Sequence, residues 1–258
     1  MWAKYKIENK QTYLWHIGNF RFYIKRLEKE FLLAKFEEDL ILNFEHEVLK
    51  HEKTPDTLVW KNYIADKTTS LNILPALPDK PLVIKTHEEL YILPGRNTTI
   101  YVRIPLSLNF YAGAETEDNL ITSEPSIMLS NTWFGDPDNG VPAYSLNSSV
   151  LYKTDDLQIR SFEIICPVKI INDSSQSFKL ERLLLDVDHL KIYQGKQGLA
   201  TNEVKIHFEG ENNSSHTQFG RLAPGFISEP KLLIKERNTS NSSVLKKSFH
   251  FLKSGISY

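Results

Sequence analysis

The chain has 258 residues, 41% of them hydrophobic, which is enough for one large domain or two small ones with a buried core. Its 31 Lys and Arg residues nearly balance 32 Asp and Glu residues, and a formal net charge of -1 excludes the overall basic field of a generic nucleic-acid-binding protein. No apolar run approaches the roughly 20 residues that cross a bilayer, so we expect no transmembrane segment.

A single cysteine, Cys166, makes an intramolecular disulfide impossible. The first ten residues also lack the apolar stretch of a signal peptide. Both features suit a reducing compartment, so we expect a cytoplasmic protein. Cys166 precedes Pro167 in a strongly apolar stretch, which predicts a buried and unreactive thiol.

The first fifty residues allow two interpretations. Residues 13–26 predict a β-hairpin whose turn is the Gly-Asn pair at 18–19. In residues 26–49 the apolar side chains fit helical spacing and strand alternation equally well. We favour strands between residues 20 and 50 because the neighbouring segments are strand-like, and a helix stays the alternative.

The middle of the chain alternates between turn clusters, rich in Gly, Pro, Asn and Ser, and short runs of β-branched and aromatic residues. This spacing is typical of an antiparallel β-domain. Residues 98–110 alternate cleanly, and Pro105 predicts an edge position or a bulge because it has no N–H to donate. Residues 158–171 and 203–210 predict further strands, and residues 81–94 predict two strands around a short connection.

The end of the chain predicts one short amphipathic helix over residues 241–255, which Ser243 caps and Gly255 stops. A helix of this length needs a partner, for which its own core, another subunit and a membrane surface are the alternatives. We expect a mainly β protein with an antiparallel β-sandwich-like architecture and this C-terminal helix. It forms a single domain over 1–258, possibly as two packed β subdomains of about 1–125 and 126–258.

The densest motif is the stretch "NTWFGDPDNGVPAY" at 131–144. It is not an EF-hand loop, because the glycine falls fifth when Asp136 is counted as the first position, and Asn147 stands where the closing Glu belongs. Proline and Asn-Gly explain a tight turn held by two aromatic residues. The alternatives are a looser cation site and a ligand-binding cleft beside Trp133, Asp136 and Tyr144.

Two other patterns concern metal or acid–base chemistry. Asp186 and Asp188 would share one face of a strand, where they could hold a metal or exchange protons, although the solvent face of an edge strand explains them better. The stretch "HEVLKHE" at 46–52 fails as a zinc helix, since His46 and His51 are five residues apart and the motif needs four. A solvated charged face is the better interpretation of that stretch.

Three segments, 74–106, 128–146 and 181–210, together resemble a known family, domain-of-unknown-function family 432. The Trp-Phe-Gly-Asp core at 133–136 is the most specific part of the resemblance. The resemblance implies a soluble β-rich protein found mostly in prokaryotes, bacteria and archaea. It carries no established catalytic residues, and it implies a membrane channel as a partner of some members.

The sequence contains no nucleophile elbow, no phosphate-binding loop and no dinucleotide fingerprint. We therefore expect no catalytic residue, no metal and no cofactor. The favoured function is a non-catalytic accessory or protein-binding module. The alternative is a small-molecule- or metal-binding protein, or a hydrolase, that uses carboxylates near Asp136 or near Asp186 and Asp188.

Overall fold

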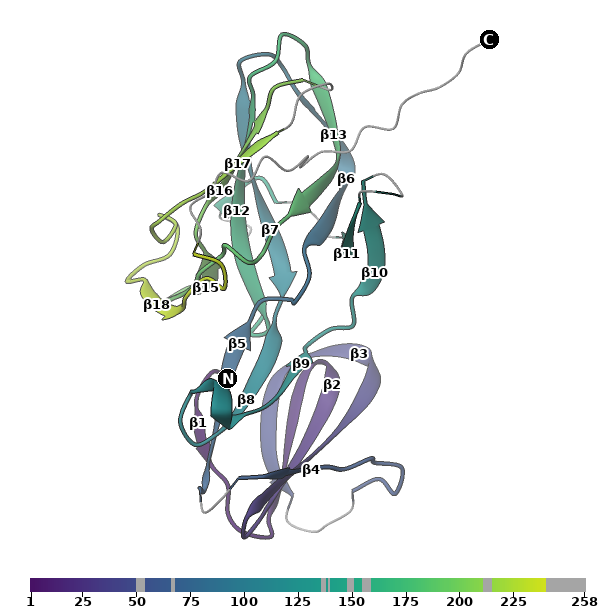
Figure 1. Cartoon of the computed structure of the whole chain (residues 1–258), viewed down its shortest axis with the longest axis vertical. Coiled ribbons are helices and arrows are strands. Elements are labelled where there is room, and N and C mark those ends of the chain that lie inside the picture. Colours follow the sequence, from purple (N-terminus) through teal and green to yellow (C-terminus); the bar gives the residue numbers. More distant parts are fainter. Residues whose placement is uncertain are drawn as a thin grey trace. The chain divides into compact units, whose positions relative to one another are not determined.

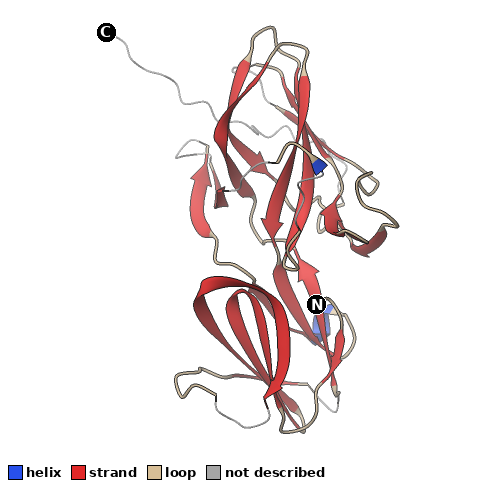
Figure 2. Ribbon diagram, turned by 180° about the vertical axis from the view of Figure 1, so that it is seen from behind, coloured by secondary structure: helices blue, strands red, loops and turns tan. Residues whose placement is uncertain are grey.

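The computed structural model is built almost entirely of β-strands (Figures 1 and 2), and no helix in its described part reaches seven residues. The structure describes residues 1–49, 54–65, 68–135, 138, 140–147, 151–154, 159–210 and 215–239. The mainly β prediction is confirmed. The helix predicted over 241–255 lies outside the described residues.

The chain folds into two compact units, each assembled from stretches that are far apart in the sequence. Unit 1 comprises residues 1–77, 105–128 and 160–162, and unit 2 comprises residues 78–104, 129–159 and 163–258. The chain therefore passes between the units several times.

Unit 1 contains two sheets. The first has the strand order β2 (Thr12–Leu27), β3 (Glu30–Leu49), β4 (Lys61–Ile64). The second has the order β1 (Lys4–Lys6), β5 (Ser70–Ala76), β8 (Ser107–Ala112), β9 (Leu120–Pro125). A 3-10 turn, Glu117–Asn119, connects β8 to β9. All pairings within these two sheets are antiparallel.

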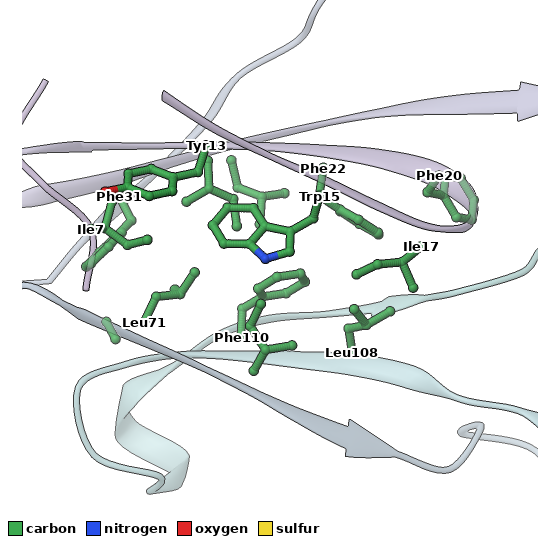
Figure 3. Packing of buried hydrophobic residues seen from close by; sticks show 14 of the residues in the cluster. Ile7, Tyr13, Trp15, Ile17, Phe20, Phe22, Phe31, Leu71, Leu108 and Phe110 are labelled. Carbon is green, nitrogen blue, oxygen red and sulfur yellow. The ribbon is translucent and has the colours of Figure 1, made fainter. Parts of the chain in front are cut away.

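Side chains from both sheets of unit 1 meet in one aromatic core around Trp15, which is fully buried (Figure 3). Tyr5 contacts the Trp15 ring edge-on at 5.5 Å between centroids, and Tyr13 stacks on it at 5.7 Å. Phe22 of β2 contacts Phe110 of β8 at 5.5 Å, which joins the two sheets directly. Each large apolar side chain buried in this way contributes roughly 1.5–3 kcal/mol, so this core holds the two sheets together.

The prediction of strands is confirmed for residues 20–49, apart from the connection at 28–29, but the predicted turn at 18–19 is wrong. β2 continues through Gly18 to Leu27, and the hairpin turns at residues 28–29. Gly18 has a φ of 60°, and a Cβ added there would lie 1.8 Å from the Ser126 carbonyl oxygen. Asn19 N–H donates to that same oxygen at 3.1 Å. The Gly-Asn pair therefore lies within β2, at a register shift and against another segment, and does not reverse the chain.

Unit 2 also contains two sheets. One has the order β10 (Ser130–Phe134), β11 (Val141–Asn147), β6 (Leu82–Ile92), β13 (Phe178–Leu185). The other has the order β17 (His216–Phe219), β16 (Val204–Phe208), β12 (Glu163–Asn172), β15 (Gly198–Thr201), β14 (Ile192–Gly195), β18 (Lys231–Ile234), with β7 (Asn97–Pro105) also paired to β12. The predicted antiparallel pairing holds for β10 with β11, β13 with β6, β14 with β15 and with β18, and β16 with β17. It does not hold for β11 with β6, β12 with β15 and β12 with β16, which are parallel pairs.

The individual strands of the middle region match the prediction with one correction. β7 ends at Pro105 and β8 begins at Ser107, so the proline interrupts the ladder as expected. The two strands predicted over 81–94 are one continuous strand, β6. Its pairing with β13 shifts register between Leu180 and Arg182, so the polar residues that suggested a connection lie at an irregularity within the strand.

We predict that Gly18→Ala destabilises the protein by about 3 kcal/mol or more, since alanine adds both a strained positive φ and a collision with the Ser126 backbone. Gly113→Ala is the matched control in the same unit. Gly113 also has a positive φ, 90°, but the three atoms nearest to its added Cβ all belong to the Thr68 side chain, the first at 3.2 Å. Urea unfolding measures both changes. Equal losses for the two variants would show that the close approach at Gly18 is unimportant.

Candidate functional site

Two of the three predicted ligand-binding residues, Trp133 and Tyr144, lie on the β10–β11 hairpin of unit 2. Cross-strand partners share a face of a sheet, and Trp133 pairs with Pro142 while Asn131 pairs with Tyr144. Trp133 and Tyr144 therefore lie on one face of the hairpin, and Trp133 is 44% exposed. Asp136, the third predicted residue, lies outside the described residues.

Tyr144 belongs to a small polar network on this face. Its hydroxyl donates to Asp79 Oδ1 at 2.9 Å, and the Lys80 ammonium lies over its ring at 4.8 Å from the centroid. Lys80 Nζ also donates to Asn131 Oδ1 at 2.8 Å. Partial burial, and then the hydrogen bond and charge of Asp79, raise the pKa of Tyr144 above its usual range. Tyr144 is therefore a neutral hydrogen-bond donor at pH 7 and not a base.

The opposite face of the same hairpin is packed. Phe134 and Ala143 are buried against Val83 and Leu184. The Arg182 guanidinium lies over the Phe134 ring at 5.7 Å and donates from Nη2 to the Trp133 carbonyl at 3.2 Å. The hairpin is thus fixed from behind and presents an aromatic, polar surface in front. That surface offers contacts for binding and no nucleophile–base pair among the described residues.

The prediction that Asp186 and Asp188 share one face of a strand is wrong. β13 ends at Leu185, and both residues lie in the turn that follows. Asp186 Oδ1 accepts the N–H of Asp188 at 3.2 Å, which is how an aspartate stabilises a turn. Asp188 forms an ion pair with Arg237 at 2.7 Å, and its carbonyl accepts the Asn238 N–H at 2.9 Å. These contacts join the turn to the segment after β18.

His189, next to these aspartates, is buried and packs against an aromatic ring. Its ring stacks on Phe219 at 4.6 Å between centroids, and its Nε2 lies 4.0 Å from Asp186 Oδ2. The buried Asn202 amide donates to the His189 and Gly220 carbonyls and accepts the Lys191 N–H. Nowhere in the described ranges do three or more histidine, cysteine or acidic side chains gather to hold a metal ion.

The structure places the single cysteine and the first histidine of the stretch at 46–52 on β-strands. Cys166 lies on β12 and is fully buried, and this burial raises the pKa of its thiol to about 12. A hydrogen bond with Thr201 acts in the opposite direction and is weaker. His46 lies on strand β3, which excludes a zinc helix through that residue, and His51 lies outside the described residues.

A surface that the sequence analysis missed is a bulge in the middle of β3, in unit 1. β2 advances from Gly18 to Phe20 while β3 advances from Glu37 to Leu42. Four β3 residues, 38–41, therefore lie opposite the single residue Asn19. We call residues 38–41 the β3 bulge. Extra residues in one strand leave the ladder and re-aim their side chains.

Neighbouring groups on β2 anchor the base of the β3 bulge. Asn19 Nδ2 donates to Glu37 Oε1 at 3.2 Å, and Arg21 forms an ion pair with Glu38 at 2.5 Å. The Ser126 carbonyl fixes the backbone of Gly18 and Asn19 directly opposite. Side-chain contacts thus hold the start of the bulge at Glu37 and Glu38, and the ladder resumes after it with the pair Gly18 and Leu42.

The β3 bulge exposes apolar side chains that the core does not use. Leu40 is 71% exposed and Ile41 is 52% exposed, and Phe36 just before the bulge is 43% exposed. Five acidic residues and no lysine or arginine occur in residues 36–49. β4 pairs only with residues 30–33 of β3, and no other described strand pairs with the rest of that edge. The β3 bulge is therefore an exposed apolar surface in an acidic stretch of unit 1.

The sequence carries one signal for this surface. The run "EEDLIL" at 37–42 breaks strand alternation by placing three acidic residues before three apolar ones. Such a break is expected where a strand bulges. This signal for a bulge is ambiguous in the sequence, because a helix, the alternative for this segment, also accommodates a block of like residues.

The chain belongs to the family described as Protein of unknown function (DUF432), whose family model matches residues 1–253. The resemblance seen in the sequence is thereby confirmed. Comparisons with curated proteins and with solved structures find no match. Within the described part of the chain, no helix has the length and apolar character needed to span a membrane.

We predict that the Cys166 thiol of the folded protein does not react with a chromogenic disulfide reagent at pH 8, because burial keeps it protonated. The urea-unfolded chain should react with one equivalent. Since the folded pKa of about 12 lies above the ordinary 9.0, this thiol favours the folded state below pH 9, and that contribution is lost as pH rises toward 12. Reaction of the native protein at the unfolded rate would contradict the buried position.

Proposed function

We propose that this protein is a non-catalytic protein-binding module and that the β3 bulge is its contact surface. The observation that carries the proposal is the pair Leu40 and Ile41, which are 71% and 52% exposed on a strand segment held by defined contacts. Apolar side chains that are fixed before binding lose little conformational freedom when a partner buries them. They are therefore suited to act as anchors of an interface.

The state of the chemical groups favours binding over catalysis. The carboxylates considered for catalysis, Asp186 and Asp188, are engaged in a turn and an ion pair. The one thiol is buried and protonated. Tyr144 is held as a neutral donor beside Asp79. Each of these groups has a structural role that leaves it poorly placed for proton transfer or nucleophilic attack.

The charges around the bulge indicate the chemistry of the partner. Glu37, Asp39 and Glu45 are exposed and lie before, within and after the bulge. A complementary surface has an apolar pocket for Leu40 and Ile41 with lysine or arginine at its rim. Two copies of this chain would bring acidic strands together, so a different protein is the better partner.

We also propose a β-sandwich arrangement for unit 1 and a cytoplasmic location. The location rests on the single, buried Cys166, which suits a reducing compartment.

The proposal predicts that a photo-crosslinking amino acid at position 40 gives one discrete adduct in lysate of the source organism. The same amino acid at position 222 is the control, since Leu222 is 81% exposed but belongs to unit 2. Mass spectrometry identifies the adduct, and a membrane channel is the partner class to examine first, as the family resemblance suggests. No position-specific adduct at residue 40 would count against the proposal.

Binding of the purified partner then measures the role of the bulge. Leu40→Asp combined with Ile41→Asp should weaken the affinity by about 30-fold or more, which corresponds to loss of a hot spot of about 2 kcal/mol. Leu222→Asp should leave the affinity unchanged. Raising the salt concentration should slow association because acidic groups surround the anchors. Wild-type affinity in the double variant would contradict the proposed function.

A further inference from the structure

We propose that His207 and His216 of unit 2 form a binding site for a divalent transition metal, oriented by Asp173. This site is separate from the β3 bulge and does not depend on the protein-binding proposal. The two histidines are direct cross-strand partners on β16 and β17. Their ring centroids lie 6.3 Å apart, and both side chains are partly exposed.

Asp173 fixes the orientation of His207. Asp173 follows the end of β12, and its N–H donates to the Phe208 carbonyl at 2.9 Å. Its Oδ2 lies 2.6 Å from His207 Nδ1. A carboxylate that accepts the proton of one ring nitrogen leaves the other nitrogen with a free lone pair, which is the arrangement found behind metal-binding histidines.

We infer from the strand order that this free nitrogen faces His216. β16 lies between β12 and β17 in the sheet. Asp173 therefore lies on one side of His207 and His216 on the other. Because the two nitrogens of an imidazole point in diverging directions, a ring whose Nδ1 faces Asp173 directs Nε2 toward the β17 side. The two imidazoles are thus arranged to converge on one ion.

The separation of the rings fits a bridging ion after a small movement. Each ring nitrogen lies about 2.1 Å from a bound zinc ion, and a tetrahedral angle at the metal requires the rings to approach by roughly 1 Å. Side-chain rotation at two partly exposed positions supplies such a change. No third histidine, cysteine or acidic ligand joins them among the described residues, so the remaining coordination positions are open to water or an outside ligand.

The chemistry of the ligands selects the metal. Neutral imidazole suits Zn²⁺, Cu²⁺ and Ni²⁺, whereas Mg²⁺ requires oxygen ligands. Lys205 lies on the same strand and face as His207, two residues earlier, and pairs with Gln218 in place of a histidine. Lys205 therefore offers a control position that shares the strand and face without contributing a ligand.

The test is calorimetric titration of the full chain with Zn²⁺, with Mg²⁺ as the contrasting ion. We expect saturable Zn²⁺ binding that His207→Gln and His216→Gln each abolish, and no Mg²⁺ binding at this site. Asp173→Asn should weaken Zn²⁺ binding by about 10- to 100-fold, as expected for a group that orients a ligand. Lys205→Gln should bind as the wild type does.

Imidazole NMR provides a readout that distinguishes this site from other histidines of the chain. Zn²⁺ should shift the ring resonances of His207 and His216 together, at the same metal concentration. Circular dichroism confirms that each variant is folded. The proposal is overturned if the wild type does not bind Zn²⁺, if either histidine variant binds it unchanged, or if the two rings respond at different metal concentrations.

Discussion

The close approach of the Ser126 carbonyl to Gly18 is the constraint on which the structure of unit 1 depends. One core cluster contains Trp15, Ile17, Phe20 and Phe22 of β2. Between them, Gly18 lies against the Ser126 carbonyl and the Asn19 N–H donates to it. The extra residues lie in the partner strand: residues 38–41 of β3 lie opposite the single β2 residue Asn19 and leave the ladder.

This constraint connects the core to the proposed function. β2 is buried on both faces, since Leu14 and Tyr23 pack beneath Leu58 and Trp60 on the side away from the Trp15 core. Because β2 is packed on both faces, the extra residues of the β2–β3 pair lie in β3. Lys35, just before the bulge, ties β3 to the buried Glu124 at 2.6 Å. The exposed Leu40 and Ile41 therefore lie on the strand that takes up the register difference beside a strand packed on both faces.

Local periodicity predicted those strands whose environment is simple. The alternation in residues 98–110 predicts β7 and β8, with Pro105 as the break. It does so because buried and less buried side chains alternate along both strands. Cys166 was predicted as buried from its apolar neighbours, and burial raises its pKa. In such segments the local pattern and the tertiary environment require the same structure.

Features that depend on contacts distant in sequence were not predictable. A Gly-Asn pair serves a turn and a bulge equally, and only the Ser126 carbonyl decides between them at Gly18. The parallel pairing of β12 with β16 has no local signature. Asp186 ends a strand because its side chain binds the backbone of Asp188, which alternation does not reveal. The placement of Trp133 and Tyr144 on one face follows from hairpin register, whereas the β3 bulge follows from a register shift.

The central claim is that residues 38–41 are ordered before any partner binds. Backbone ¹⁵N relaxation of the free protein tests it most directly, because order parameters report motion on the picosecond-to-nanosecond timescale. The account predicts that the order parameters of residues 38–41 are close to those of residues 31–35 on the same strand. Both sets should be about 0.85, the value typical of rigid backbone. Values below about 0.6 confined to residues 38–41 would contradict it, since the exposed Leu40 and Ile41 would then belong to a flexible loop.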